Sequence, residues 1–385
     1  MKKIIKKILL IFLIIVGVIV VGAGGYCGYI LLSYDRIGDI DLDVKTKSTQ
    51  NKVLLDTTYS ATTYNIGFGA YSQDFTFFLD TGYDEDGNET CGYYSKAKSK
   101  EEVIFNVNGS INTIKELNPD FVLLQEVDIK STRSHKVNQN EMFVNSLGSY
   151  DNVFAYNFDT AYLPYPLYDM HGKSLAGLST FSKYKIKEAS RVEYTISDSL
   201  SKLFDIDRCF SVSIIEVENG KKLYMINSHM SAYDKGGTIR EKQIKELNEF
   251  LSKCKENGDY VVVGGDFNHD LLTNNPDYSY NQENRVFNNT LKDPDWVASY
   301  FDENGKSPLI EGYKVVASDN VPTCRNNDIP YEKGKTYVCA VDGFIVSSNI
   351  EIVEHYNVET QNGNLNVDGF AYSDHQPAYI EFKLK

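Results

Sequence analysis

Apolar residues along this chain form one long run near the N-terminus and many short runs after it. The long run covers residues 8–32 and contains no charged side chain. The short runs have the length and the β-branched and aromatic content of buried strands. These predicted strands cover residues 60–66, 121–124, 153–156, 211–217, 223–227, 260–263, 338–346 and 378–382.

Two further segments have the spacing of amphipathic helices. Residues 107–117 carry apolar side chains at 107, 111, 114 and 117, and residues 238–254 carry them at 239, 244, 247, 250 and 251. Spacing of three and four residues gathers apolar side chains on one face of a helix. Strands and helices mixed in this way predict an α/β layered fold with sheets at its centre. Residues 68–106, aromatic and polar by turns, are expected to be an insertion.

The long apolar run is sufficient to cross a bilayer, which takes about 20 apolar residues in a helix. Lysines 2, 3, 6 and 7 precede it, and aspartates 35, 39, 41 and 43 follow it. Because positive residues stay on the cytoplasmic side, we expect residues 1–7 in the cytoplasm and the bulk of the chain outside the membrane. A cleaved signal peptide is the alternative, with Gly22-Ala23-Gly24 as its cleavage site. The apolar run continues past that site, which favours a membrane anchor at residues 8–32.

The chain after the apolar run is expected to consist of a linker followed by one domain. Residues 33–56 are polar and lack apolar periodicity, so we expect a linker there. No Pro-, Gly- or Ser-rich break and no repeat interrupts residues 57–385, so one domain is the simplest interpretation. The cysteines outside the apolar run form no C-x-x-C pair, which disfavours a zinc knuckle. Whether Cys324 and Cys339 pair across a hairpin stays open.

Charge narrows the range of partners. The net charge is −14, and the chain after residue 32 carries −18 once the four N-terminal lysines are set aside. Nucleic-acid-binding domains usually carry a basic face, because neutralised phosphates supply much of the affinity. The acidic domain therefore disfavours a long polyanion as substrate, although a local basic groove would still accommodate one.

Polar side chains gather where predicted strands end, which is where a rigid scaffold meets an open loop. Each one alone is as well explained as a turn residue or a solvated edge. Together, carboxylates, amides and two histidines at such junctions predict a catalytic site. These residues are Asn65, Glu126, His229, Asp266, Asn268, Asp342, Asp374 and His375.

The ordered segments that carry these residues resemble the endonuclease/exonuclease/phosphatase superfamily, which includes deoxyribonucleases, neutral sphingomyelinases and inositol-polyphosphate 5-phosphatases. The resemblance runs from about Tyr59 to the C-terminus. It implies a four-layer α/β sandwich, with two mixed sheets face to face and helices outside. It also implies phosphoester hydrolysis by an activated water. The segments are Tyr64-Asn65, Gln125-Glu126, His229, Gly265-Asp266-Phe267-Asn268, Asp342 and Ser373-Asp374-His375.

The same resemblance implies a divalent metal ion. Glu126 would hold Mg²⁺ or Mn²⁺, and Asn65 and Asp374 would complete the metal and phosphate shell. Hard carboxylate and water ligands suit such an ion, which neutralises phosphate charge.

Catalytic roles follow from the resemblance in the same way. His375 would be the general base, oriented by Asp342, because a carboxylate fixes the imidazole tautomer. Asp266 and Asn268 would position the nucleophile and a phosphoryl oxygen. His229 would stabilise or protonate the leaving oxygen. In deoxyribonuclease-like members a Glu supports this histidine, and no such Glu can be placed in the sequence.

Other residues are similar to those of a membrane-anchored bacterial branch of the superfamily. An arginine fork binds phosphate through two hydrogen bonds. A structural salt bridge is an equally good interpretation for each arginine. The candidates for substrate binding are Arg133, Asn157, Arg240 and Arg325.

These features predict a monomeric, metal-dependent phosphoesterase on the extracytoplasmic side of the membrane. A phospholipid or other small phosphoester fits the anchor and the acidic charge. An extracellular nuclease is the alternative within the same chemistry, and a non-catalytic surface-binding protein is the alternative of another class. The aromatic residues 68–78 offer a lipid-contacting loop, but packing into the core is the favoured interpretation.

Overall fold

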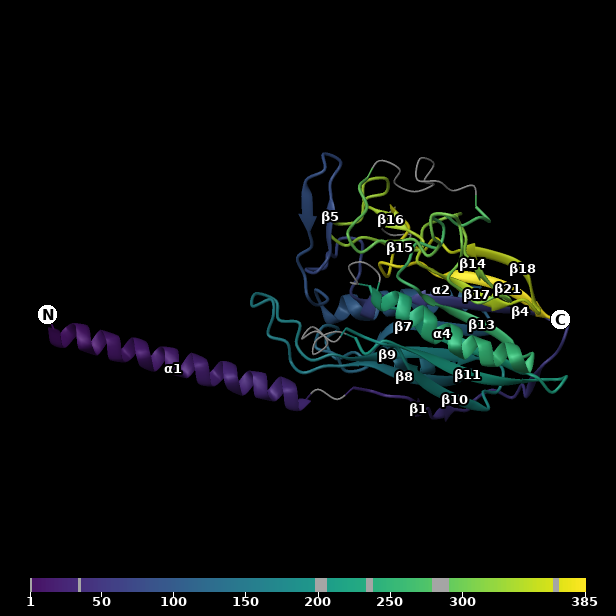
Figure 1. The fold of residues 1–385 in the computed structure, drawn as a ribbon, viewed down its shortest axis with the longest axis horizontal. Coiled ribbons are helices and arrows are strands. Elements are labelled where there is room, and N and C mark those ends of the chain that lie inside the picture. Colours follow the sequence, from purple (N-terminus) through teal and green to yellow (C-terminus); the bar gives the residue numbers. More distant parts are fainter. Residues whose placement is uncertain (1, 34–35, 198–205, 233–237, 279–290, 363–366) are drawn as a thin grey trace.

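Two large mixed β-sheets lie face to face at the centre of the domain (Figure 1). The structure is a computed structural model that describes residues 2–33, 36–197, 206–232, 238–278, 291–362 and 367–385. The first sheet has the order β1-β10-β11-β12-β13-β17-β14, with β3 paired to β11. Its strands are β1 (Ile40–Asp41), β3 (Lys52–Val53), β10 (Glu188–Glu193), β11 (Cys209–Val217), β12 (Lys222–His229), β13 (Tyr260–Asp266), β14 (Tyr313–Val316) and β17 (Asp342–Ser347).

The second sheet has the order β18-β21-β4-β7-β9-β8-β2. Within it β4 and β7 are parallel, as β12 and β13 are in the first sheet. Both parallel pairs therefore present the carboxyl ends of two adjacent strands at one edge. The strands are β2 (Val44–Lys45), β4 (Thr58–Asn65), β7 (Phe121–Asp128), β8 (Asp151–Asp159), β9 (Leu175–Ser182), β18 (Ile350–Asn357) and β21 (Ala378–Leu384).

Alternation along the central strands builds three apolar layers. On β7, Phe121 and Leu123 face the first sheet and pack with Met225 and Val262, while Val122 and Leu124 face outward. A strand buried on both faces reads as a continuous apolar run, which is why the sequence predicted these strands.

Three helices cover the outer faces of the two sheets. Helices α2 (Lys100–Leu117) and α3 (Gln139–Ser146) pack on the second sheet, and α4 (Thr238–Asn257) packs on the first. Helix α2 begins at the N-cap Ser99, whose side chain accepts a hydrogen bond from the Glu102 amide. The predicted four-layer α/β sandwich is confirmed.

Several elements differ from their predicted bounds. Residues 338–346 were expected to form one strand, but β16 (Val338–Cys339) pairs with β15 (Cys324–Arg325), and only β17 joins the first sheet. Cys324 and Cys339 lie opposite each other in this hairpin as free thiols. Residues 33–56, expected to be a linker, supply β1, β2 and β3 to the edges of both sheets. Two-residue strands carry no periodicity that a sequence could show.

The expected insertion at residues 68–106 is largely folded into the domain. It contains the short helix η1 (Gly67–Gly69), which begins one residue earlier, and the hairpin β5–β6 (Thr81–Tyr83 and Glu89–Cys91). Phe68, Phe75 and Phe77 are buried against α2. This packing supports the favoured interpretation, in which these aromatic residues belong to the core. A further short pair, β19 (Gln361–Asn362) and β20 (Val367–Asp368), lies before β21.

Helix α1 (Lys2–Ser33) extends away from the domain as an exposed apolar rod (Figure 1). The most apolar 18-residue window of the helix has a mean hydropathy of 3.0, and none of this window is buried. The helix is therefore long and apolar enough to cross a membrane. An N-terminal signal sequence meets the same criteria. The last turns touch the domain, because Ile30 is buried and Tyr26 and Tyr29 hydrogen-bond Tyr162.

We predict that Gly265→Ala destabilises the fold by about 1–3 kcal/mol, the usual range for overpacking a core. A Cβ at Gly265 would lie 2.0 Å from the carbonyl oxygen of Ser228 on the adjacent strand β12. Denaturant unfolding in detergent measures the change. Gly148→Ala is the matched control, since a Cβ there meets no atom within 4 Å. Equal unfolding midpoints for the two variants would contradict the close strand approach.

Candidate active site

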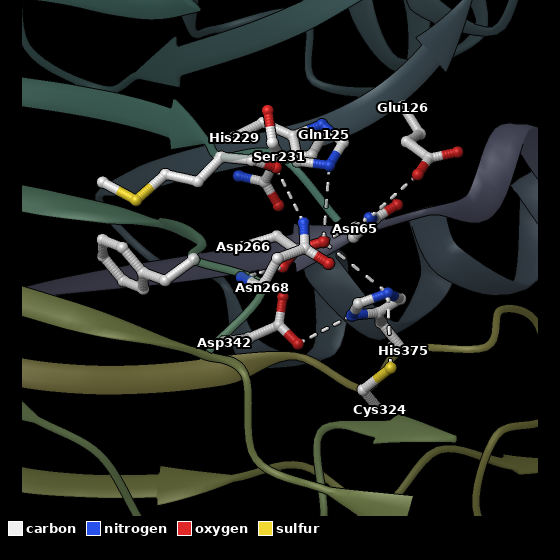
Figure 2. Close-up of polar contacts among 12 residues, drawn as sticks. Asn65, Gln125, Glu126, His229, Ser231, Asp266, Asn268, Cys324, Asp342 and His375 are labelled. Carbon is white, nitrogen blue, oxygen red and sulfur yellow. Dashed lines mark hydrogen bonds and ion pairs between the residues drawn. The ribbon is translucent and has the colours of Figure 1, made fainter. Parts of the chain in front are cut away.

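Both sheets contribute side chains to one cluster at the carboxyl ends of their parallel strands (Figure 2). Asn65 ends β4 and Glu126 lies near the end of β7 in the second sheet, while His229 ends β12 and Asp266 ends β13 in the first. Buried polar groups need hydrogen-bond partners, and those that lie between the two sheets find many of them in one another. The sequence-predicted residues are thus brought together from segments far apart in the chain.

Asp266 is the centre of this cluster. Its Oδ2 accepts a hydrogen bond from Nδ2 of Asn65 at 3.0 Å, and it lies 3.5 Å from Nε2 of His229 and 3.7 Å from Nε2 of His375. Its Oδ1 accepts from the backbone amide of Asn268 at 2.9 Å. Burial raises the pKa of Asp266, with His375 acting in the opposite direction and Asp342 adding to the rise. One carboxylate therefore orders groups from both sheets.

His375 is held in a fixed orientation by Asp342. Its Nδ1 lies 2.7 Å from Oδ2 of Asp342, and its Nε2 points toward Asp266 and lies 3.7 Å from Sγ of Cys324 (Figure 2). The carboxylate accepts a hydrogen bond, so it fixes the proton on Nδ1. Burial lowers the pKa of His375, but Asp342, Cys324 and Asp266 outweigh burial and hold it well above its usual value.

Glu126 lies in a β-bulge, where the pairing of β7 with β9 shifts register. Its φ of 53° places a non-glycine residue in the left-handed region, which costs on the order of 1–3 kcal/mol and is frequent at functional sites. Its Oε1 accepts a hydrogen bond from Nδ2 of Asn65 at 3.3 Å. Burial raises the pKa of Glu126, and Arg133 opposes the rise.

His229 differs from the expectation for a proton donor. It is buried, its Nε2 faces Asp266, and its Nδ1 has no hydrogen-bond partner among the described residues. Burial, with the positive Arg208 nearby, lowers the pKa of His229 well below its usual value. The supporting Glu that the sequence did not show is therefore also missing from the described part of the site.

Comparison with known proteins identifies the family. A family model for the endonuclease/exonuclease/phosphatase family matches residues 103–375, more than half of the sequence. The chain belongs to the endonuclease/exonuclease/phosphatase family. No curated protein matches its sequence.

Several solved structures share the fold. TDP2 from D. rerio, complexed with a single-strand DNA product, matches with a TM-score of 0.52 at 14% identity. The match covers 85% of this chain and 100% of the TDP2 chain. ANGEL2, a 2′,3′-cyclic phosphatase in complex with adenosine-2′,3′-vanadate, matches with a TM-score of 0.51 at 15% identity. The match covers 90% of this chain and 99% of the ANGEL2 chain. A protein from Beutenbergia cavernae has a TM-score of 0.50 at 13% identity, with 85% and 72% covered. At these identities the likeness shows the fold.

Enzymes of this family typically use divalent metal ions, and two places in the cluster offer hard ligands. Donor atoms of Asp266, Asp342 and His375 lie within 4.8 Å of one another, but His375 and Asp342 already bond each other. Glu126 lines the cavity and has no direct cation partner among the described residues. A positive charge would stabilise its ionised form, which burial disfavours. Its chemistry fits a divalent ion. The Asn65 oxygen accepts a hydrogen bond from the Gly67 amide, and its Nδ2 donates to the carboxylates of Glu126 and Asp266.

The cluster opens into a cavity of about 640 Å³. Glu126, His229, Asp266, Asn268, Asp374 and His375 lie on its wall. Asp374 accepts hydrogen bonds from Asn327 and Ser373. Much of the remaining wall is aromatic, including Phe78, Tyr165 and Trp296.

Among the described residues three arginines line the cavity, and they differ in their hydrogen-bond partners. The Arg133 fork is already bound to Asp128 at 3.2 and 3.0 Å. Arg325 donates from Nη2 to the carbonyls of Ser72 and Phe75, leaving Nε and Nη1 without partners among the described residues. Arg208, which sequence reasoning missed, likewise has unpartnered Nε and Nη1. No motif marks Arg208, since it is a lone basic residue before β11.

Two sequence candidates for substrate binding lie outside the cavity wall. Arg240 donates to the carbonyls of Asn268 and Trp296, so it holds the backbone of Asn268, whose φ is 51°. Asn157 is buried in β8 beside a register shift, away from the cavity lining. For Arg240 the structural interpretation fits the geometry better than phosphate binding does.

We predict that Arg240→Met lowers the free energy of unfolding by about 1–3 kcal/mol, because it leaves buried carbonyls without donors. Arg208→Met, matched in chemistry, should change the free energy of unfolding by less than about 0.5 kcal/mol or raise it. It removes a buried charge whose Nε and Nη1 have no hydrogen-bond acceptor among the described residues. Denaturant unfolding compares the two. A larger loss for Arg208→Met would contradict these assignments.

Proposed function

We propose that this family member is a metal-dependent phosphoesterase that acts on the extracytoplasmic side of a membrane, on a phospholipid or another small phosphoester. The observation that carries the proposal is the 2.7 Å hydrogen bond between His375 and Asp342. The ring of His375 faces the cavity beside Asp266. A carboxylate–imidazole pair at the wall of a cavity is the arrangement of a general base.

The neutral form of His375 would take the proton from the attacking water at Nε2, the ring nitrogen that faces the cavity. The negative groups that raise its pKa make this form a stronger base. Asp342 keeps the other ring proton on Nδ1 and stabilises the imidazolium that forms. Asp266, 3.7 Å from Nε2, would orient the water through its carboxylate. A bound Mg²⁺ or Mn²⁺ at Glu126 would neutralise phosphate charge and the charge of the leaving oxygen.

Phosphate recognition is assigned to donors that lack a protein partner. Arg208 and Arg325 line the cavity and each keep two guanidinium nitrogens without a described acceptor. A buried, unpaired guanidinium is costly, and an anion offsets that cost. His229, held neutral by burial, would donate a hydrogen bond to the substrate rather than act as an acid.

The site of action is supported by α1 and the charges around it. Four lysines precede the apolar helix and acidic residues follow it, which favours a cytoplasmic N-terminus and an external domain. A nuclease on the same fold remains the alternative, and a substrate panel with single-stranded DNA, RNA and phospholipids distinguishes the two.

We predict that the full chain in detergent hydrolyses bis-p-nitrophenyl phosphate with Mg²⁺ or Mn²⁺, and that chelator abolishes the activity. His375→Ala should lower kcat by about 10²–10⁴, the usual contribution of a general base. His355→Ala is the matched control, because His355 lies on β18 and bonds Ser318 outside the cavity. No hydrolysis of any phosphoester by the wild type would favour a non-catalytic binding protein.

We also predict that Arg208→Met raises KM at least about tenfold, which corresponds to the loss of a charge-assisted hydrogen bond of about 1.5–3 kcal/mol. Lys187→Met is the control, because Lys187 is an exposed cation paired with Glu216. Steady-state kinetics on the same phosphodiester measures both variants. An unchanged KM for Arg208→Met would remove Arg208 from the phosphate site.

A further inference from the structure

Large apolar and aromatic side chains gather on one exposed rim of the domain. Leu167 is 78% exposed, Tyr168 60% and Tyr165 58% in the connection between β8 and β9. Exposed side chains of this size rarely cluster without a partner on a soluble surface. We call this set the aromatic rim, and it comprises Leu79, Tyr93, Tyr162, Tyr165, Leu167 and Tyr168.

The aromatic rim is built on an ordered framework. Tyr168 stacks on Tyr93 with ring centroids 4.9 Å apart and donates to its carbonyl at 3.0 Å. Asp169, the next residue, accepts from the Ser95 amide at 2.9 Å and pairs with Lys96 at 2.8 Å. These contacts therefore hold the rings in an exposed position, although burial would remove their apolar surface from water.

The rim lies beside the last turns of α1. Tyr26 donates from its hydroxyl to the carbonyl of Tyr162 at 2.9 Å, and the amide of Tyr162 donates to the hydroxyl of Tyr29 at 3.2 Å. Figure 1 shows the β8–β9 connection, in teal, reaching from the domain toward this helix. The rim is thus tied to a fixed height on the apolar helix.

That height coincides with the edge of a bilayer. The hydrocarbon core is about 30 Å thick and a helix rises about 1.5 Å per residue, so about 20 residues cross it. Counted from Ile8, the first residue after the lysines, the span ends near Cys27, between Tyr26 and Tyr29. Tyrosine favours this boundary, where its ring is apolar and its hydroxyl is wet.

The active-site cavity opens at the same rim. Leu79 and Tyr165 belong to the rim and also line the cavity that contains His375, and Tyr165 packs on Phe78 at 5.8 Å between ring centroids. A molecule lying in the outer leaflet beside α1 therefore faces the aromatic wall first and the catalytic cluster behind it.

We propose that the aromatic rim docks on the outer leaflet of the membrane that α1 crosses, and that the substrate is a lipid phosphoester drawn from that leaflet. The rim provides no charge of its own for a polyanion, and the net charge of −18 after residue 32 disfavours a second copy of the same acidic chain. The substrate part rests on the proposed function. The docking part rests on the rim and on the membrane topology of α1 given in the proposed function, but not on the proposed catalytic activity.

Docking is tested in proteoliposomes that hold the full chain and lipids with brominated acyl chains. Leu167→Trp places a reporter on the rim, and Val353→Trp places one on the exposed strand β18. The wild type, with its single Trp, supplies the background. We expect at least about half of the added emission from position 167 to be quenched and none from position 353. Emission from position 167 as unquenched as from position 353 would overturn the docking.

The substrate class is tested with Leu167→Asp/Tyr168→Asp, with Val353→Asp as the control. We expect the rim variant to lose at least about tenfold in rate on mixed vesicles of phosphatidylglycerol, sphingomyelin and phosphatidylinositol phosphates. Its rate on bis-p-nitrophenyl phosphate should stay unchanged. Hydrolysis of the soluble ester without any vesicle lipid would overturn the lipid substrate and leave the proposed function standing. Hydrolysis of neither would overturn the proposed function, while quenching still decides the docking.

Discussion

The structure depends on the contact that Asp266 makes across the two sheets. Asn65 reaches it from the second sheet, His229 reaches it from the next strand of the first, and His375 reaches it from the loop before β21. A buried carboxylate is tolerated only where other polar groups satisfy it, so its partners are fixed as firmly as the core around them. Beneath it, Gln125 donates to Asn227 at 2.7 Å and joins the sheets a second time. The chemistry of the site is therefore part of what aligns the sandwich.

This constraint explains why the cluster lies where it does. Parallel pairing of β4 with β7 and of β12 with β13 brings four strand ends to one edge, and the close approach at Gly265 lets β13 lie against β12 there. Two residues beside it, Glu126 and Asn268, have a left-handed backbone. Outside this ring the wall of the cavity becomes aromatic and leads to the surface next to α1. The candidate catalytic groups and the aromatic residues of the wall thus line one cavity.

Much of this arrangement could be predicted from sequence, and what could not has physical reasons. Buried strands such as β7 and β13 are visible in the sequence as continuous apolar runs. The ordered motifs at their ends indicated the family. Strands of two residues, such as β1 and β3, carry no period, so residues 33–56 were expected to be a linker. Arg240 was expected to bind substrate, but its guanidinium donates to the backbone carbonyl of Asn268. Only the fold determines which groups lie next to this guanidinium. Arg208 has no motif. The exposed aromatic residues of the rim, such as Tyr165 and Tyr168, are indistinguishable in sequence from buried ones such as Phe75.

In the proposed mechanism His375 and Asp342 act as one unit in proton transfer. A double-mutant cycle on phosphodiester hydrolysis, with His375→Ala, Asp342→Asn and the double variant, tests it most directly. Each single change should cost on the order of 10²–10⁴ in kcat, and the double variant should lose no more than about threefold beyond His375→Ala. Losses that multiply in the double variant would show that the two residues act independently, which would contradict the account.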